Sequence, residues 1–352
     1  MADSATDSII RWAWVARYAE QFRACNLQPG EVAVLLSEAA SQPAIVATAR
    51  LALEHCGAAV AEVRLPTPPN PGPLPIRSTG ASQAIAGHRA AIAALRAADF
   101  VVDCTAEGLL HAPELGDILS GSARVLMISA EHPENCERWP HDPALAGKVD
   151  RGLGLLQEAA EMRVTSPAGT DLTVRLDGAF RAGSYGWCTE AGQIAHWPGG
   201  LVLAFPAAGS VDGTVVLAPG DVNLTFKEYV REPITLTIEA DYIVDIGGAG
   251  HDAELMREYL AAFGEPAAYA TSHVGWGMNP AARWEALAMW DKADINGTEL
   301  RAFAGNVVYS TGANEVAGRF CRGHFDLPMR GCTVTVDDEV VVDAGVLRSD
   351  LA

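Results

Sequence analysis

The sequence lacks the features of a nucleic-acid-binding or membrane protein. It has 25 Lys and Arg residues against 44 Asp and Glu residues, a formal net charge of −19, and no Lys/Arg-rich run, so it repels a phosphate backbone. No segment offers 18 apolar residues without a charge, and the N-terminus has no basic start followed by an apolar stretch. We therefore predict a cytoplasmic protein with no nucleic-acid or membrane partner.

A disulfide framework is also missing. The seven cysteines are an odd number and include no CxxC pair, which favours reduced, mostly buried thiols. The length of 352 residues predicts two domains, and a hydrophobic fraction of 49% with 20% charged residues is ordinary globular composition.

The N-terminal part, residues 1–150, is predicted to be an α/β domain with an open parallel sheet. Between about 31 and 130, short apolar runs alternate with helical stretches; the runs are EVAVLLSE, AAVAEVRL, FVVDC and RVLMIS. Strands that are apolar on both faces and separated by helices are typical of a parallel sheet. A proline-rich surface loop is expected at 66–75.

The C-terminal part, residues 151–352, is predicted to be a mixed α+β domain. Helices are expected at 142–161, 251–263 and 279–291. The segments PITLTIEADYIVDIGG and CTVTVDDEVVVDAG resemble hairpins that turn at Ala240-Asp241 and Asp337-Asp338, because polar residues interrupt a period-two alternation there.

Motifs for nucleotide binding and serine hydrolysis are weak or missing. The nearest approaches to a phosphate-binding loop are Gly247-Gly248-Ala249-Gly250 and Gly152-Leu153-Gly154, and glycines used for turns explain both. No Gly-x-Ser-x-Gly elbow occurs. Neither a nucleotide cofactor nor a catalytic serine is therefore supported.

The segment CRGHFDLP carries the richest chemistry. In an extended strand, His324 and Asp326 project to the same face and could bind one ion. His273, in TSHVGWG, is the best third candidate because the glycines around it let the backbone approach a site. Two histidines and a carboxylate that leave open positions are typical of non-haem Fe(II) oxygenases. The spacing alone also allows a strand histidine bonded to a neighbouring carboxylate.

Other histidines are weaker candidates. His111 follows an apolar run near the expected mouth of the parallel sheet, and His196 lies in the turn-rich sequence HWPGG. A surface histidine and a histidine stacked on Trp197, respectively, are equally good interpretations. His251 and Glu254 lie three apart on an expected helix, where a solvated face is the better interpretation than a metal site.

From about residue 195 onward, a series of motifs in one order resembles the 2,5-dihydroxypyridine 5,6-dioxygenase family, which is related to the M29 metallo-aminopeptidases. The motifs are HWPGG, SHVGWG followed by Pro280 and Trp284, RAFAGNVVYSTGANEVAG, HFDLP and VDDEVVV. A series of this kind is far more specific than His-x-Asp alone.

The resemblance implies a mononuclear Fe(II) held by His273, His324 and Asp326, with His111 and His196 as pocket histidines. It implies extradiol-type cleavage of the ring bond next to nitrogen in nicotinate degradation. Both atoms of O2 would enter the product, N-formylmaleamate.

For the mechanism, we expect a small aromatic substrate and O2 as partners, with His111 or His196 as the base that takes the ring hydroxyl proton. Ser310 and Thr311, in the turn YSTG, are expected to contact the substrate. We also expect a homo-oligomer.

Three alternatives stay open. The region before residue 195, above all 180–193, looks unlike the family, so another hydroxy-aromatic could be the substrate. An M29-type metallo-aminopeptidase would need a second metal and bridging carboxylates. A small-molecule binding protein of the same fold would bind its ligand without consuming O2.

Overall fold

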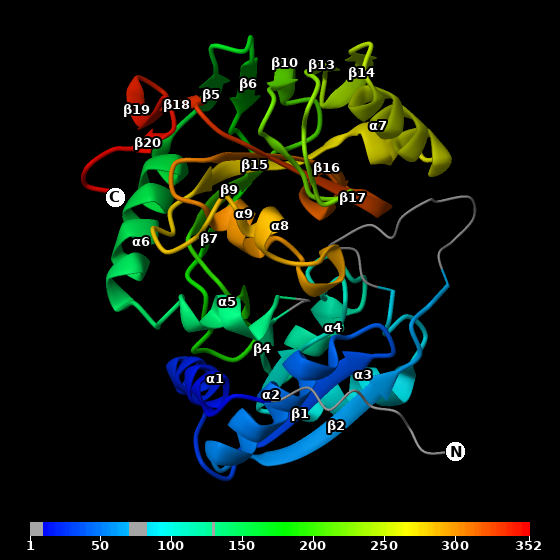
Figure 1. Cartoon of the computed structure of the whole chain (residues 1–352), viewed down its shortest axis with the longest axis vertical. Coiled ribbons are helices and arrows are strands. Elements are labelled where there is room, and N and C mark those ends of the chain that lie inside the picture. Colours follow the sequence, from blue (N-terminus) through cyan, green and yellow to red (C-terminus); the bar gives the residue numbers. More distant parts are fainter. Residues whose placement is uncertain (1–9, 70–82, 129–130) are drawn as a thin grey trace.

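A computed structural model describes residues 10–69, 83–128 and 131–352. Figure 1 shows a parallel sheet at one end of the molecule and antiparallel sheets at the other. The strands of the parallel sheet are, in spatial order, β2 (Ala59–Leu65), β1 (Val32–Glu38), β3 (Phe100–Asp103), β4 (Arg124–Met127) and β8 (Ile194–His196). The predicted open parallel sheet is confirmed.

Helices cover both faces of this sheet, as the doubly apolar strands require. In β1, Ala33 and Leu35 pack into one core cluster, while Val34 and Leu36 pack into the cluster on the other face. The first face is covered by α1 (Trp12–Ala24), α2 (Pro43–His55) and α5 (Pro133–Glu137), and the second by α3 (Arg89–Ala97) and α4 (Leu115–Leu119).

Two antiparallel sheets form the other end of the molecule. The eight-stranded sheet contains, in spatial order, β14 (Tyr242–Gly247), β13 (Ile234–Glu239), β10 (Val211–Leu217), β6 (Asp171–Arg175), β5 (Glu161–Thr165), β18 (Thr333–Val336), β19 (Glu339–Asp343) and β20 (Val346–Leu347). The five-stranded sheet contains β17 (Arg319–Met329), β16 (Val307–Asn314), β15 (Thr271–Gly277), β9 (Leu201–Phe205) and β7 (Phe180–Ser184).

One large core joins these two sheets. It includes Leu172 and Leu236 from the eight-stranded sheet and Trp276 and Phe325 from the five-stranded sheet, all fully buried or nearly so. The remaining elements are α6 (Pro143–Glu158), α7 (His251–Ala262), α8 (Ala286–Met289), α9 (Thr298–Ala302), the pair β11 (Val222–Asn223) and β12 (Glu228–Tyr229), and the 3-10 turns η1 (Pro266–Tyr269), η2 (Lys292–Asp294) and η3 (Glu315–Ala317). The mixed α+β character of this part is confirmed.

Most local predictions are confirmed. Ala240 and Asp241 turn the β13–β14 hairpin with φ of 45° and 80°, and Asp337 has a φ of 49° between β18 and β19, as two-residue turns require. The helices expected at 142–161 and 251–263 are α6 and α7. All seven cysteines are free thiols.

The prediction of a helix over 279–291 is wrong, because only α8 (Ala286–Met289) is α-helical within this range. Asn279 is bound into the neighbouring chain instead: its backbone N–H donates to Ala302 O, its side-chain amide donates to Gly199 O, and its side-chain oxygen accepts from the Ala281 N–H. These bonds, with Pro280 next to them, replace those of a first helical turn.

Three further expectations have partial outcomes. The parallel sheet takes its last strand, β8, from beyond residue 150, and the two-domain boundary stays a prediction. Within the proline-rich loop, residues 66–69 have no regular secondary structure, and the remainder lies outside the described residues. No helix in the described ranges is long and apolar enough to cross a membrane.

The hairpin turn at Asp241 is held by a buried ion pair, which gives a stability prediction. Arg319 Nη1 donates to Asp241 Oδ2 over 2.7 Å, and both side chains are almost fully buried. Because Arg319→Met leaves the carboxylate buried without its cation, we expect a loss of about 3 kcal/mol in unfolding free energy in urea. The exposed pair of Arg163 with Asp171 provides the control, and Arg163→Met should lose far less. Equal losses would contradict this account.

Candidate metal centre

Two strands of the five-stranded sheet carry the predicted metal ligands. His273 lies on β15, while His324 and Asp326 lie on β17, and β16 runs between these strands. A bulge between Thr271 and Val274 shifts the register at His273, and such a bulge re-aims a side chain. The Asp326 Oδ1 atom lies 3.5 Å from His273 Nε2 and 3.2 Å from His324 Nε2. The structure thus brings all three side chains together.

Close backbone packing places these strands. Gly312 lies opposite His324 in the β16–β17 register, with a φ of +108°. A Cβ atom there would lie 2.0 Å from Gly323 O, and one at Gly275 would lie 2.0 Å from Val202 O. Only glycine fits such close approaches, so the glycines around the histidines are a steric requirement of the site.

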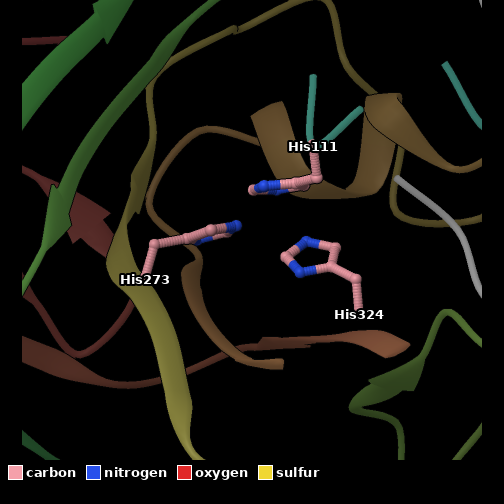
Figure 2. Close-up of side chains that lie close together, drawn as sticks. All are labelled: His111, His273 and His324. Carbon is pink, nitrogen blue, oxygen red and sulfur yellow. The ribbon is translucent and has the colours of Figure 1, made fainter. Parts of the chain in front are cut away.

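A third histidine faces the same space from the parallel-sheet side. His111 follows β3, and its ring centroid lies 4.5 Å from that of His324. One ligand nitrogen from each of His111, His273 and His324 lies within 4.8 Å of the other two. Figure 2 shows the three rings directed toward one another.

These side chains line one cavity between the parallel sheet and the five-stranded sheet. His196, at the carboxyl end of β8 and paired with Met127, lines it too. The lining residues are Glu107, Leu110, His111, Met127, His196, Leu201, Leu203, His273, Asn296, Thr298, Arg301, Val308, His324 and Asp326. All five predicted metal and catalytic residues therefore meet in one place.

The carboxylate of Asp326 is ionised although it is buried. Burial alone would raise the pKa of Asp326, but the Arg301 guanidinium and the two histidines hold that pKa well below its usual range. Arg301 Nε donates to Oδ2 over 2.5 Å, and Ser310 Oγ donates to Oδ1. The carboxylate is thus a stable anionic ligand candidate.

Three histidines of the cavity, His111, His196 and His273, have a lowered pKa. Burial lowers the pKa of His273 well below its usual value and also lowers the pKa of His111. Burial and then the charge of Arg301 lower the pKa of His196 to about 4. Neutral imidazoles have a lone pair for a metal ion or a proton.

The two predicted substrate contacts lie on β16. Ser310 donates to Asp326, and Thr311 is buried with no hydrogen-bond partner for its hydroxyl among the described residues. Neither is among the residues that line the cavity, so their contact with a substrate stays a prediction. His251 and Glu254 lie on an exposed helix face, as predicted.

Sequence reasoning missed the residues that hold the ligands in place. Arg301 binds Asp326, and Glu315 Oε1 lies 3.5 Å from His111 Nδ1. Asn296 also lines the cavity and accepts from Arg301 Nη1 over 3.1 Å. Arg301 and Glu315 lie in the motif RAFAGNVVYSTGANEVAG. This motif was the signal in the sequence that could have identified them as site residues.

Comparisons with known proteins agree on one family. The family model described as 2,5-dihydroxypyridine 5,6-dioxygenase matches residues 13–349. A 2,5-dihydroxypyridine 5,6-dioxygenase of Pseudomonas putida KT2440 is 39% identical over 318 residues, which cover 89% of each chain.

Solved structures give the same picture. The structure of 2,5-dihydroxypyridine dioxygenase from Pseudomonas putida KT2440 has a TM-score of 0.89 and 34% identity, and the match covers 96% of this chain and 97% of that one. AmpT from Thermus thermophilus has a TM-score of 0.63 at 14% identity over 95% of this chain and 98% of its own, and shares the fold.

The depressed pKa of His196 predicts acid sensitivity of the metal-free protein. In the unfolded chain His196 takes up a proton below about pH 6.5, whereas in the folded chain it stays neutral down to about 4. Its stabilising effect is therefore complete above pH 6.5 and is lost as the pH falls toward 4.

Between pH 7 and pH 5, we expect the wild type to lose on the order of 1–2 kcal/mol more unfolding free energy than His196→Gln. Urea unfolding at both pH values measures this difference. A His251→Gln variant, changed on the exposed helix face, should follow the wild type. A His196→Gln variant with the wild-type pH dependence would refute the effect.

Proposed function

The chain belongs to the 2,5-dihydroxypyridine 5,6-dioxygenase family, and we propose that it uses one non-haem Fe(II) ion to open the ring of 2,5-dihydroxypyridine with O2. The observation that carries this proposal is the convergence of His273, His324 and Asp326 on one wall of a largely buried cavity. Cleavage of the bond between ring carbons 5 and 6, with both oxygen atoms entering N-formylmaleamate, needs no external reductant.

The donor set fits an iron ion. Two imidazole nitrogens and one ionised carboxylate oxygen match the two-histidine, one-carboxylate sets that hold Fe(II) in oxygenases. The Nε2 atoms of His273 and His324 both face Asp326 Oδ1, and the carboxylate offsets part of the charge of a buried dication.

Asp326 is a better third ligand than His111. Its Oδ1 atom already lies within 3.5 Å of both Nε2 atoms and brings the negative charge that a neutral imidazole lacks. His111 is then free to handle protons. Bound at this set, Fe(II) supplies open coordination positions and the redox chemistry that lets O2 react with a hydroxylated ring.

The pocket histidines have different electrostatic surroundings. The Nε2 atom of His111 is buried without a hydrogen-bond partner among the described residues, and Glu315 faces its other nitrogen. A proton on Nδ1 leaves Nε2 as an acceptor, so we assign His111 as the base that takes the ring hydroxyl proton. His196 lies in the field of Arg301, which opposes a second proton, so it serves as a neutral hydrogen-bond donor to substrate oxygen.

The apolar part of the cavity lining suits a flat aromatic ring. Leu110, Leu201, Leu203 and Val308 supply apolar surface, while polar groups gather around the ligands. This distribution supports a hydroxy-aromatic substrate that is oriented by a few polar contacts. The homo-oligomeric state and the cytoplasmic location stay predictions.

Oxygen consumption tests the substrate. After anaerobic loading with Fe(II), the protein should consume one O2 per 2,5-dihydroxypyridine, as followed with an oxygen electrode and by loss of the substrate absorbance. A panel of other hydroxylated pyridines and benzenes serves as the comparison. O2 uptake with another ring only would show that the proposed substrate is wrong but the proposed reaction is right. No O2 uptake with any ring would contradict the dioxygenase function.

Iron retention tests the ligand set. His324→Ala and Asp326→Ala should lose bound iron while circular dichroism shows an intact fold. His111→Ala should keep iron but lose most of its activity, because a base contributes roughly 10²–10⁴-fold. His251→Ala, on an exposed helix face, is the matched control and should retain one iron per chain. Loss of iron in His111→Ala would point to a three-histidine site, and two metals per chain would favour a hydrolase.

A further inference from the structure

Arg301 is held at two points beside the proposed ligand Asp326. Its Nε donates to Asp326 Oδ2 over 2.5 Å, and its Nη1 donates to Asn296 Oδ1 over 3.1 Å. The Arg301 side chain is only 13% exposed and also lines the cavity. A planar guanidinium bound in this way has little freedom to turn.

The short helix α9 that carries Arg301 is fixed from the parallel-sheet side. Glu131, which is fully buried, accepts the backbone N–H of Gly297 over 2.9 Å and that of Thr298 over 2.6 Å. Glu299, on the same helix, is paired with Arg138. Because five residues do not form a stable helix alone, these contacts determine where Arg301 lies.

The two oxygens of Asp326 therefore have different partners. Arg301 occupies Oδ2, while Oδ1 faces the Nε2 atoms of His273 and His324. Oδ1 also accepts a hydrogen bond from Ser310 Oγ. Removal of Arg301 would therefore leave Oδ2 open to a metal ion beside Oδ1.

We propose that Arg301 is a positioning residue that occupies Oδ2 of Asp326 and so reserves Oδ1 as the single carboxylate oxygen offered to the metal. The inference rests on the proposed function, because it takes Asp326 to be a ligand. Ligation through one oxygen leaves an additional coordination position for the substrate or O2. Arg301 thereby controls how many positions the centre keeps open.

Substitution of Arg301 can strengthen or weaken metal binding, and the direction shows whether the charge of Arg301 or its orientation of Asp326 dominates. Removing a cation beside the ligand should by itself strengthen the binding of a divalent ion, because one repulsive charge disappears. Loss of the fixed orientation of Asp326 should instead weaken metal binding. Outer-shell partners of metal ligands typically contribute roughly 10–100-fold in affinity. Weaker binding in Arg301→Met would therefore identify positioning as the dominant role.

The experiment uses the full-length metal-free protein under anaerobic conditions. The wild type, Arg301→Met and Arg301→Lys are titrated with Fe(II) for affinity and with Co(II), whose visible absorption reports coordination number. We expect roughly 10–100-fold weaker affinity and a changed Co(II) spectrum in Arg301→Met. Arg301→Lys keeps the charge without the planar fork and should fall between the two.

Arg124→Met is the matched control. Arg124 is also a buried arginine paired with a carboxylate, that of Glu31, but neither residue lies on α9 or lines the cavity. It should lower thermal stability and leave the metal affinity and the Co(II) spectrum of the folded protein near those of the wild type. If Arg301→Met does not fold, the metal affinity and Co(II) spectrum of Arg301→Lys are compared with those of the wild type, and this comparison tests the proposal.

Unchanged or tighter metal binding in the Arg301 variants, with an unchanged Co(II) spectrum, would overturn the proposal. A wild type that binds metal but consumes no O2 with 2,5-dihydroxypyridine would remove only the proposed substrate. A wild type that binds no metal would overturn both the proposed function and this role of Arg301.

Discussion

The site depends on one buried carboxylate and the cation that keeps it ionised. Asp326 lies in a core where an unpaired charge costs several kcal/mol, and Arg301 compensates for that burial. The same carboxylate faces the imidazoles of His273 and His324. The pair therefore stabilises the fold around the cavity and also keeps an anionic oxygen ready for a divalent ion.

The fold places these groups by joining two architectures. The carboxyl end of the parallel sheet brings His111 and His196, while β15 and β17 of the five-stranded sheet bring His273, His324 and Asp326. Proton-handling groups and ligands thus come from opposite walls of the cavity.

Local patterns in the sequence predicted much of this arrangement. The doubly apolar runs, the turn at Ala240-Asp241 and the alternation that directs His324 and Asp326 to one face all depend on neighbouring residues. His273 was selected from its glycine-flanked setting, and the resemblance implied the same residue, although spacing alone does not show which distant strands pair. The false helix at 279–291 has the opposite cause, since contacts of Asn279 with Gly199 and Ala302 outweigh local preference. Arg301 was missed for the same reason: its helix is held by Glu131, 166 residues from Gly297.

The central claim is that His273, His324 and Asp326 hold a single iron. Anomalous diffraction at the iron edge, on crystals of the protein loaded anaerobically with Fe(II), tests it most directly. The account predicts one peak at bonding distance from Nε2 of both histidines and from Oδ1 of Asp326, with Oδ2 still on Arg301. A peak bonded to His111 in place of Asp326, two peaks, or no peak in this cavity would contradict it.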